Sequence, residues 1–310
     1  MPRPLKIGFG LPDSEYMLDG VTARWSDLAA LAGRAEEAGF DSVWIQDHLL
    51  FRFPGRASEA PWESFSLLAA LAAVTSHVEL GTLVTCTSFR NPALTAKIAD
   101  TIDEISGGRV ILGLGAGWHE PEYIAFGYPF DYRVSRFEEA IQIIHGLLHD
   151  GQIDFDGKYY QARECELRPR GPRPNGPPIL LGTTGERMLG LTARYADAWN
   201  AYFTRTGNRA AGIRPLNAAV DAACAREGRD PATLARTITA YVDLRGDAPE
   251  GVSTVNPSGE PPLRGAPEEI AAELRAYVAE GVSHVQVYLE PSTLEGLERF
   301  QPVLEALDRG

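Results

Sequence analysis

Strand-like and helix-like runs alternate along the whole of this chain, and that alternation constrains the fold more than any other feature. The sequence predicts strands at residues 6–11, 42–47, 78–84, 110–116, 178–182, 198–203, 237–244 and 284–289. It predicts helices at residues 25–38, 63–76, 92–105, 133–149, 186–195, 210–226, 267–279 and 294–307. Eight strand–helix units favour a closed (β/α)8 TIM barrel over a doubly wound open sheet, and 310 residues suit one barrel. We therefore expect residues 1–310 to form a single domain of the α/β class.

Two segments interrupt the alternation. Residues 151–176 contain Asp156-Gly157 between two alternating runs, a pattern that predicts a β-hairpin outside the barrel. Residues 246–265 follow the seventh strand. Because the loops after the strands lie at the C-terminal face of a barrel, we expect this long loop to close over a site.

The end of the second predicted strand, in VWIQDH, carries the first functional signal. Side chains alternate across a strand, and in a barrel one set must be apolar because it faces the helices. Val43 and Ile45 fit that set, so parity turns Trp44, Gln46 and His48 toward the barrel axis. His48 falls at the C-terminal end of the strand, where barrels place their chemistry.

Two carboxylates are further candidates. Asp47 precedes His48 but has the opposite parity, so we expect that Asp47 does not orient the imidazole directly. On the eighth strand, parity turns Tyr288 and Glu290 inward, which makes Glu290 a second candidate proton carrier. A lone histidine is often a satisfied core residue, but its place at a strand end beside polar neighbours favours a role for His48.

The fourth predicted strand, in RVILGLGAGW, carries glycine on one face. Gly113, Gly115 and Gly117 share one parity. Glycine weakens a strand interior, so its repetition implies that something lies close against this face. A flat polycyclic ring is one candidate, and bulky neighbours across the barrel are the alternative.

Short motifs exclude some chemistry and suggest other chemistry. GLGAGW lacks the last glycine of a dinucleotide fingerprint, because Trp118 stands there. HEPEY, which begins at His119, lacks the second histidine of a zinc-binding helix, and no metal site is expected. The turn Gly182–Gly185, which reads GTTG, follows a strand and opens a helix, so its N–H groups and hydroxyls could bind an anion.

Composition narrows the partners and the compartment. A net charge of −13 would repel phosphate backbones, so no nucleic acid partner is expected. The longest apolar run, residues 67–74, is too short to span a bilayer, so no membrane partner is expected. Three cysteines without C-x-x-C spacing indicate reduced thiols, and we expect a cytoplasmic protein.

Several stretches together resemble a known family. They are the Asp47-His48 pair, GTLVTCTSFRNPALTAK, GGRVILGLGAGWHEPEYIAFGYPF and the closing GVSHVQVYLEP. They are similar to the luciferase-like monooxygenase superfamily and, within it, to the branch that uses the deazaflavin coenzyme F420. The resemblance covers nearly the whole chain. It implies a (β/α)8 barrel with a deazaflavin or flavin mononucleotide (FMN) at its C-terminal mouth, and it implies a homodimer.

The resemblance also implies site residues. Asp47 and His48 match the pair beside the ring and its substrate, and Leu83-Val84 matches a non-prolyl cis peptide behind the ring. The implied cofactor contacts are Asp47, Leu83, Val84, Gly115, Ala116, Gly117, Gly182, Thr183, Thr184 and Gly185. Trp118 stands where sugar-phosphate dehydrogenases of this branch carry a catalytic glutamate, and lysines are scarce after residue 97, so a sugar phosphate is not the expected substrate.

We hypothesise that the protein is an F420-dependent oxidoreductase, which transfers a hydride between deazaflavin C5 and a small organic substrate. His48 would hydrogen-bond the substrate or move a proton, with Asp47 and Glu290 as further catalytic candidates. Trp44 and Trp118 would wall the substrate pocket, and an F420 or flavin reductase would be the electron source. Two alternatives stay open: a two-component monooxygenase that uses reduced FMN and oxygen, and a non-catalytic flavin-binding protein.

Overall fold

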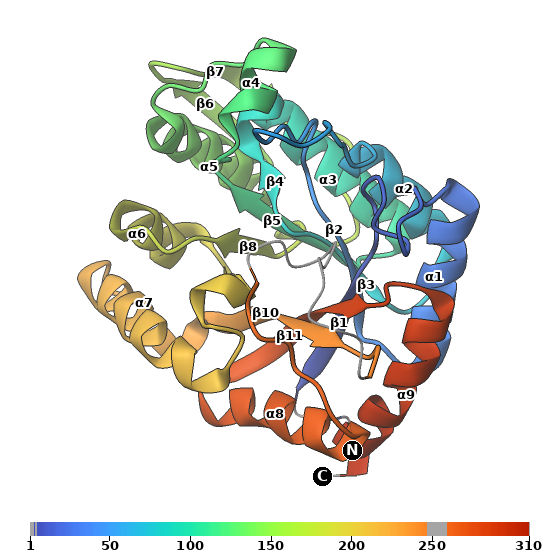
Figure 1. Ribbon diagram of the computed structural model, residues 1–310. Helices are drawn as coiled ribbons and strands as arrows, with labels where there is room; N and C mark the ends of the chain where they lie inside the picture. Colours follow the sequence, from blue (N-terminus) through green and yellow to red (C-terminus); the bar gives the residue numbers. More distant parts are fainter. Residues whose placement is uncertain (1–2, 4, 247–258, 310) are drawn as a thin grey trace.

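The computed structural model describes residue 3, residues 5–246 and residues 259–309. In Figure 1 a ring of strands lies inside a layer of helices. The strands of the ring are β1 (Lys6–Gly10), β2 (Ser42–Ile45), β3 (Glu79–Thr82), β4 (Thr85–Cys86), β5 (Val110–Gly115), β8 (Ile179–Gly182), β9 (Ala198–Ala201), β10 (Ala235–Asp243) and β11 (Val282–Glu290). The helices are α1 (Trp25–Ala38), α2 (Ser64–Val74), α3 (Pro92–Ser106), α4 (Glu120–Phe126), α5 (Arg133–Asp150), α6 (Glu186–Tyr195), α7 (Arg214–Arg226), α8 (Pro267–Ala279) and α9 (Leu294–Arg309).

The strands form one closed sheet. Its order is β3-β2-β1-β11-β10-β9-β8-β5-β4, and β3 also pairs with β5, so the two ends of the sheet meet. The strand pairs within it are parallel. β3 and β4 are two pieces of one strand, so the described residues form a barrel of eight strands. The predicted (β/α)8 barrel is confirmed.

The outward strand faces follow the predicted parity. Val43 and Ile45 of β2, and Val285 and Val287 of β11, belong to the buried cluster that also holds the apolar side chains of the helices. Burying one face of every strand against helices is what requires this parity.

Trp44 fills the barrel interior beneath the strand ends. Its side chain is 1% exposed, and its indole N–H donates to the Ser42 hydroxyl at 2.7 Å. A β-carbon at Gly8 or at Gly81 would collide with the indole. Glycine on the two neighbouring strands therefore makes the room that Trp44 occupies.

Local sequence signals set the helix ends, as α3 illustrates. The Asn91 side chain accepts hydrogen bonds from the N–H groups of Ala93 and Leu94 at 2.9 and 3.2 Å, and Pro92 occupies the first turn. Gly107 ends the helix in the left-handed conformation, with φ of 69°. These are the residue types that stabilise helix ends, and they place α3 against the strands on either side of it.

The structure departs from the predicted elements in a few places. The short helix α4 was not predicted; Pro121 lies in its first turn, where proline is tolerated. The third strand breaks after Thr82 at a cis Leu83-Val84 peptide bond, which the resemblance had implied. The predicted helix 210–226 begins as a 3-10 segment, Ala210–Ile213.

The two interruptions of the barrel have different outcomes. β6 (Gln152–Asp156) and β7 (Gln161–Glu166) form an antiparallel hairpin within the expected excursion. Of the long loop expected after the seventh strand, residues 247–258 lie outside the described residues. Among the described residues, no helix has the length and apolar character that crossing a bilayer requires.

Candidate active site

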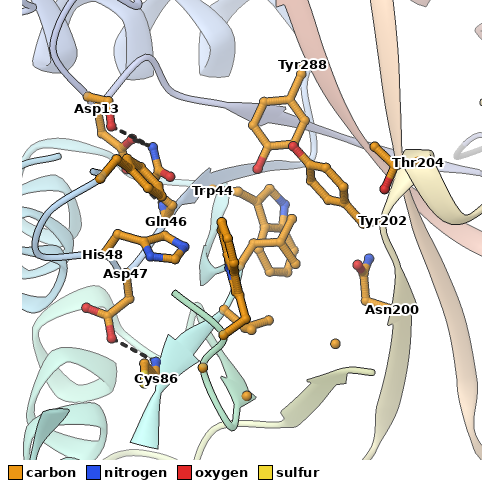
Figure 2. A pocket seen from close by; sticks show the side chains of 18 of the residues that line it. Asp13, Trp44, Gln46, Asp47, His48, Cys86, Asn200, Tyr202, Thr204 and Tyr288 are labelled. Carbon is orange, nitrogen blue, oxygen red and sulfur yellow. Dashed lines mark hydrogen bonds between the residues drawn. The ribbon is translucent and has the colours of Figure 1, made fainter. Parts of the chain in front are cut away.

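A cavity of about 930 Å³ lies at the carboxyl ends of the barrel strands (Figure 2). Most of the predicted site residues line it: Trp44, Asp47, His48, Leu83, Val84, Gly115, Ala116, Gly117, Trp118, Gly182, Thr183 and Thr184. Glu290 and Gly185 are not among the lining residues. Parity predicted the inward Trp44 and His48, and the family resemblance implied most of the other lining residues. The role of each residue there stays a prediction.

His48 points into the cavity (Figure 2) and is held from behind by a carboxylate. Its Nδ1 lies 2.9 Å from Oε1 of Glu122, which comes from α4 and is 1% exposed. The other oxygen of Glu122 accepts hydrogen bonds from the backbone N–H groups of Leu49 and Leu50 at 2.8 and 3.3 Å. Because a carboxylate only accepts, Nδ1 of His48 carries the hydrogen and Nε2 is the atom available to a ligand.

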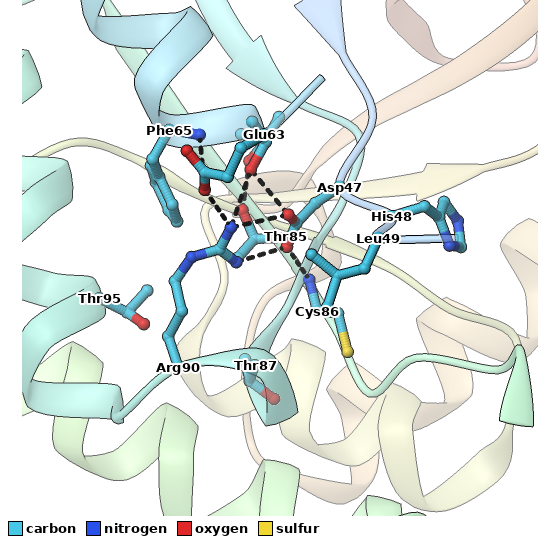
Figure 3. A network of polar contacts seen from close by, with 12 residues as sticks. Asp47, His48, Leu49, Glu63, Phe65, Thr85, Cys86, Thr87, Arg90 and Thr95 are labelled. Atoms are coloured by element: carbon cyan, nitrogen blue, oxygen red, sulfur yellow. Dashed lines mark hydrogen bonds and ion pairs between the residues drawn. The ribbon is translucent and has the colours of Figure 1, made fainter. Parts of the chain in front are cut away.

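Asp47 has a different environment from its neighbour. One of its oxygens accepts from Nη1 of Arg90 at 2.8 Å and from the N–H of Cys86 at 2.9 Å. The other accepts from Nη2 of Arg90 at 3.0 Å and from the Ser64 hydroxyl at 2.7 Å. Figure 3 shows Arg90 lying between Asp47 and Glu63. Asp47 therefore joins β2 to the start of α2 and to the segment before α3, and the geometry gives it a structural task, while its predicted catalytic role is untested.

The glycine face of β5 is occupied by protein atoms. A β-carbon at Gly113 would collide with the backbone oxygen of Thr82, and one at Gly115 would lie 2.7 Å from Val84. A β-carbon at Gly117 would collide with the hydroxyl of Tyr123. The alternative of bulky neighbours therefore holds for these positions. Gly115 and Gly117 also line the cavity, and their contact with a cofactor ring stays a prediction. The residues of the cis Leu83-Val84 bond lie beside this face and present their own side chains to the cavity.

Glu290 is inward-facing and buried, as parity predicted, but it does not reach the cavity. Its carboxylate accepts a hydrogen bond from the Tyr241 hydroxyl and forms an ion pair with Arg245 at 3.0 Å. The prediction of Glu290 as a second proton carrier at the cavity is therefore wrong. Tyr241 on β10 and Arg245 just after β10 cover the carboxylate. The alternation within β11 alone gives no sign of either residue.

The turn after β8, the predicted anion site, lines the cavity in part. Thr183 and Thr184 line the cavity, whereas Gly185 precedes α6 outside the lining. The Trp199 indole N–H donates to the Thr183 carbonyl at 2.7 Å and anchors the turn. Arg205, which ends a 3-10 segment after β9, also lines the cavity. Because β8 and β9 are neighbours, the hydroxyls of Thr183 and Thr184 and the guanidinium of Arg205 lie on one side of the cavity.

Two site residues were missed by the sequence argument. Glu122 lies within HEPEY, which lacks the second histidine of a zinc motif, and within a stretch that carries the family resemblance, which implied no role for this residue. Asp13 follows β1, is 1% exposed and lines the cavity. Its two oxygens accept from the backbone N–H and the side-chain amide of Gln46, both at 2.8 Å. The inward parity of Gln46 was predicted, and Asp13 could have been found as the polar residue that ends the first strand run.

Asp13 gives the protein a predictable dependence of stability on pH. Burial raises the pKa of Asp13 from 3.8 to about 7. Between these values the folded protein keeps a proton that the unfolded chain has lost, so stability present below about pH 4 is lost as the pH rises through about 7. We expect Asp13→Asn to remove this trend. The unfolding free energy of the variant minus that of the wild type should then increase by up to about 1.4 kcal/mol for each unit by which the pH rises.

Urea unfolding of both proteins at about pH 5, 6 and 7 measures this difference. Asp154→Asn, a change of the same kind on the exposed hairpin, is the control and should follow the wild type. If Asp13→Asn and the wild type lost stability in parallel over this range, the assignment of the proton to Asp13 would be wrong.

The described residues include possible metal ligands and one cysteine at the cavity. No group of three or more histidine, cysteine, aspartate or glutamate side chains among the described residues is placed to hold a metal ion. Cys86 lines the cavity, but burial raises the pKa of its thiol to about 12, which makes it a poor nucleophile near neutral pH.

A closed parallel barrel whose polar side chains gather at the carboxyl ends of the strands defines a TIM-barrel protein. A family model described as "Luciferase-like monooxygenase" matches residues 7–255. The chain belongs to the luciferase-like monooxygenase family.

Relatives with different named activities match the chain. The F420-dependent hydroxymycolic acid dehydrogenase of Mycobacterium tuberculosis is 35% identical over 242 residues, which is 76% of this chain and 62% of the relative. The pyrimidine monooxygenase RutA of Stutzerimonas stutzeri is 36% identical over 208 residues, which is 64% of this chain and 56% of the relative. The chain thus spans less than two thirds of the length of either protein.

Solved structures share the fold over nearly the whole chain. An F420-dependent secondary alcohol dehydrogenase in complex with an F420-acetone adduct superposes with a TM-score of 0.80 at 20% identity, covering 98% of this chain and 99% of that one. EDTA monooxygenase from Chelativorans sp. BNC1 superposes with a TM-score of 0.78 at 16% identity, covering 99% of this chain and 94% of that one. At these identities the likeness describes the fold alone.

Proposed function

We propose that this protein is an oxidoreductase that binds coenzyme F420 and transfers a hydride between the deazaflavin and a small organic substrate. The observation that carries the proposal is the held imidazole of His48. Glu122 fixes it through Nδ1 and leaves Nε2 facing a cavity large enough for a cofactor and a substrate. The 35% identity over 242 residues to an F420-dependent dehydrogenase supports the choice of cofactor.

The residues around the cavity fit a deazaflavin. The cavity volume of about 930 Å³ is near the upper end for ligand sites, which commonly measure about 300–1,000 Å³. Leu83, Val84 and Ala116 give one side an apolar surface suited to a fused ring. Thr184 and Arg205 on the β8–β9 side offer a hydroxyl and a guanidinium to a phosphate.

F420, when bound, supplies the carbon that gives or accepts the hydride. The part that falls to the chain is the proton. In the neutral imidazole Nε2 of His48 accepts a proton from a substrate hydroxyl, and in the imidazolium it returns one, while Glu122 keeps the ring in place. Tyr202 and Tyr288 lie across the cavity from His48 (Figure 2) and close the opposite wall.

A second candidate is a monooxygenase that uses reduced FMN and oxygen. It is favoured by the 36% identity to a pyrimidine monooxygenase, and the hydroxyls and guanidinium on the β8–β9 side would suit the FMN phosphate equally well. The predicted homodimer, the cytoplasmic location and a reductase as electron source stay predictions under either candidate.

A binding titration separates the two candidates. We expect purified protein to quench or shift F420 fluorescence saturably, with an affinity at least about tenfold higher than for FMN, a difference of about 1.4 kcal/mol. Parallel titrations at equal ionic strength measure both affinities, and Arg205→Ala should weaken each of them because both cofactors carry phosphate. Tighter binding of FMN would overturn the F420 proposal and favour oxygen chemistry.

A further inference from the structure

The segment between β2 and α2 folds back on itself over the cavity, and residues 51–59 are here called the arm. The Phe51 N–H donates to the Glu59 carbonyl at 2.7 Å, and the Glu59 N–H donates to the Phe51 carbonyl at 3.1 Å. Gly55 turns the chain between them with φ of 75°. Phe51 and Phe53 line the cavity, whereas Arg52, which lies between them, is exposed. The arm therefore presents its aromatic side inward.

Phe51, Phe53 and Trp118 form an aromatic wall. Their ring centroids lie 6.1 Å apart for Phe51–Phe53 and 6.4 Å apart for each of the two pairs with Trp118. The ring planes of the three pairs differ by 14°, 33° and 26°. Because the three rings have similar orientations, a flat ligand can contact several of them at once, whereas a puckered ligand cannot.

The aromatic wall is held in place and adjoins His48. The Arg52 N–H donates to Nε2 of His119 at 2.9 Å, which ties the arm to the loop that carries Trp118. The His48 ring lies 4.4 Å from Phe51 and 5.6 Å from Trp118, centroid to centroid. A ring bound to the wall would therefore lie within reach of the imidazole.

Trp118 is 57% exposed although it lines the cavity, so a large apolar surface there is open to a ligand. The arm also carries Arg56 and Glu59, one basic and one acidic residue, into the cavity lining. Because neither sign of charge predominates at these two positions, this wall suits an uncharged ligand better than an ion.

We propose that the aromatic wall is the substrate site and that the substrate is an uncharged, flat, conjugated ring compound with an oxygen that reaches Nε2 of His48. The inference rests on the proposed function, because it takes the apolar side formed by Leu83, Val84 and Ala116 as the place of the cofactor. The two ligands then occupy separate walls of one cavity. Hydride transfer leaves the ring skeleton unchanged, and the proton that balances the charge passes through His48.

Coumarin and octahydrocoumarin test the proposal, because they share a bicyclic skeleton and a carbonyl but only coumarin is flat. Equilibrium dialysis measures their binding to the protein alone and to the protein saturated with F420. We expect coumarin to bind about tenfold more tightly than octahydrocoumarin in both states, as one or two aromatic contacts predict. Equal affinities, or displacement of coumarin by F420, would overturn the proposal, since the wall would then be unselective or part of the cofactor site.

Variants locate the binding on the wall. Trp118→Leu and Phe51→Leu should each weaken coumarin binding several-fold, up to about tenfold, and change octahydrocoumarin binding by less than about twofold. Trp25→Leu is the matched control, because Trp25 is 43% exposed at the start of α1 and does not line the cavity. Full retention of coumarin binding by Trp118→Leu and Phe51→Leu would sink the assignment. Preference for FMN over F420 in the cofactor titration would overturn the proposed function. The dialysis of coumarin with the protein alone would still test the aromatic wall by itself.

Discussion

In a His48→Ala variant we expect kcat to fall by about 10²- to 10⁴-fold, while the affinity for the cofactor is unchanged. Nε2 of His48 is the group proposed for proton transfer at the cavity, whereas the apolar surface and the hydroxyls proposed to hold the cofactor come from other strands. Steady-state turnover and a parallel cofactor titration measure the two quantities separately. A variant that bound F420 and turned over at the wild-type rate would place the proton carrier elsewhere, with Asp13 next in line.

Glu122→Gln tests the same arrangement from behind the ring. Glutamine keeps the size of the side chain but sets its amide donors against His48 Nδ1–H or against the N–H groups of Leu49 and Leu50. A displaced imidazole should lower kcat by about 10²-fold and change the pH profile of the reaction, which a merely weakened fold would not do. Glu120→Gln, on the exposed side of the same helix, is the control and should behave as the wild type.

An Arg90→Met variant is expected to lose about 3–5 kcal/mol of unfolding free energy. Asp47 is 2% exposed, and Arg90 is the cation that both of its oxygens contact. Removing the guanidinium leaves a buried carboxylate without its counter-charge, which costs far more than losing a surface pair. Urea unfolding of the variant and of the wild type gives the difference.

Two further variants make the Arg90 measurement specific. Arg163→Met removes an ion pair with Asp156 in which both side chains are more than 70% exposed, and it should cost less than about 1 kcal/mol. The double variant Arg90→Met/Asp47→Asn should recover part of the lost unfolding free energy, because it removes the buried negative charge together with the guanidinium that neutralises it. A loss below about 1 kcal/mol in Arg90→Met would mean that water or Ser64 already satisfies Asp47.

The barrel and the position of its cavity could be predicted because they follow from local alternation. One face of each strand must be apolar against the helices, so the parity of Val43 and Ile45 alone determined that Trp44 and His48 face inward. The same reasoning predicted that Glu290 faces inward. Alternation says which face a side chain takes, and it carries no information about what lies opposite that face.

The contacts that define the candidate site come from pairs far apart in the chain, which is why they could not be predicted. Glu122 is 74 positions from His48, and a single sequence gives no reason to pair them. The neutralisation of Glu290 depends on Tyr241 and Arg245, which reach it from the neighbouring strand and the segment after it. The glycines of β5 correctly indicated a close approach. The approaching groups, Thr82 at Gly113 and Val84 at Gly115, lie on either side of a break in another strand.

Trp44 has a consequence for the order of events during turnover. Because its buried indole fills the barrel interior below the cavity, the way in that the described residues show is the mouth at the carboxyl ends of the strands. Ligands on the two separate walls of the cavity would share this one entrance. A compound that covers the mouth should therefore exclude both ligands and compete with each of them for binding.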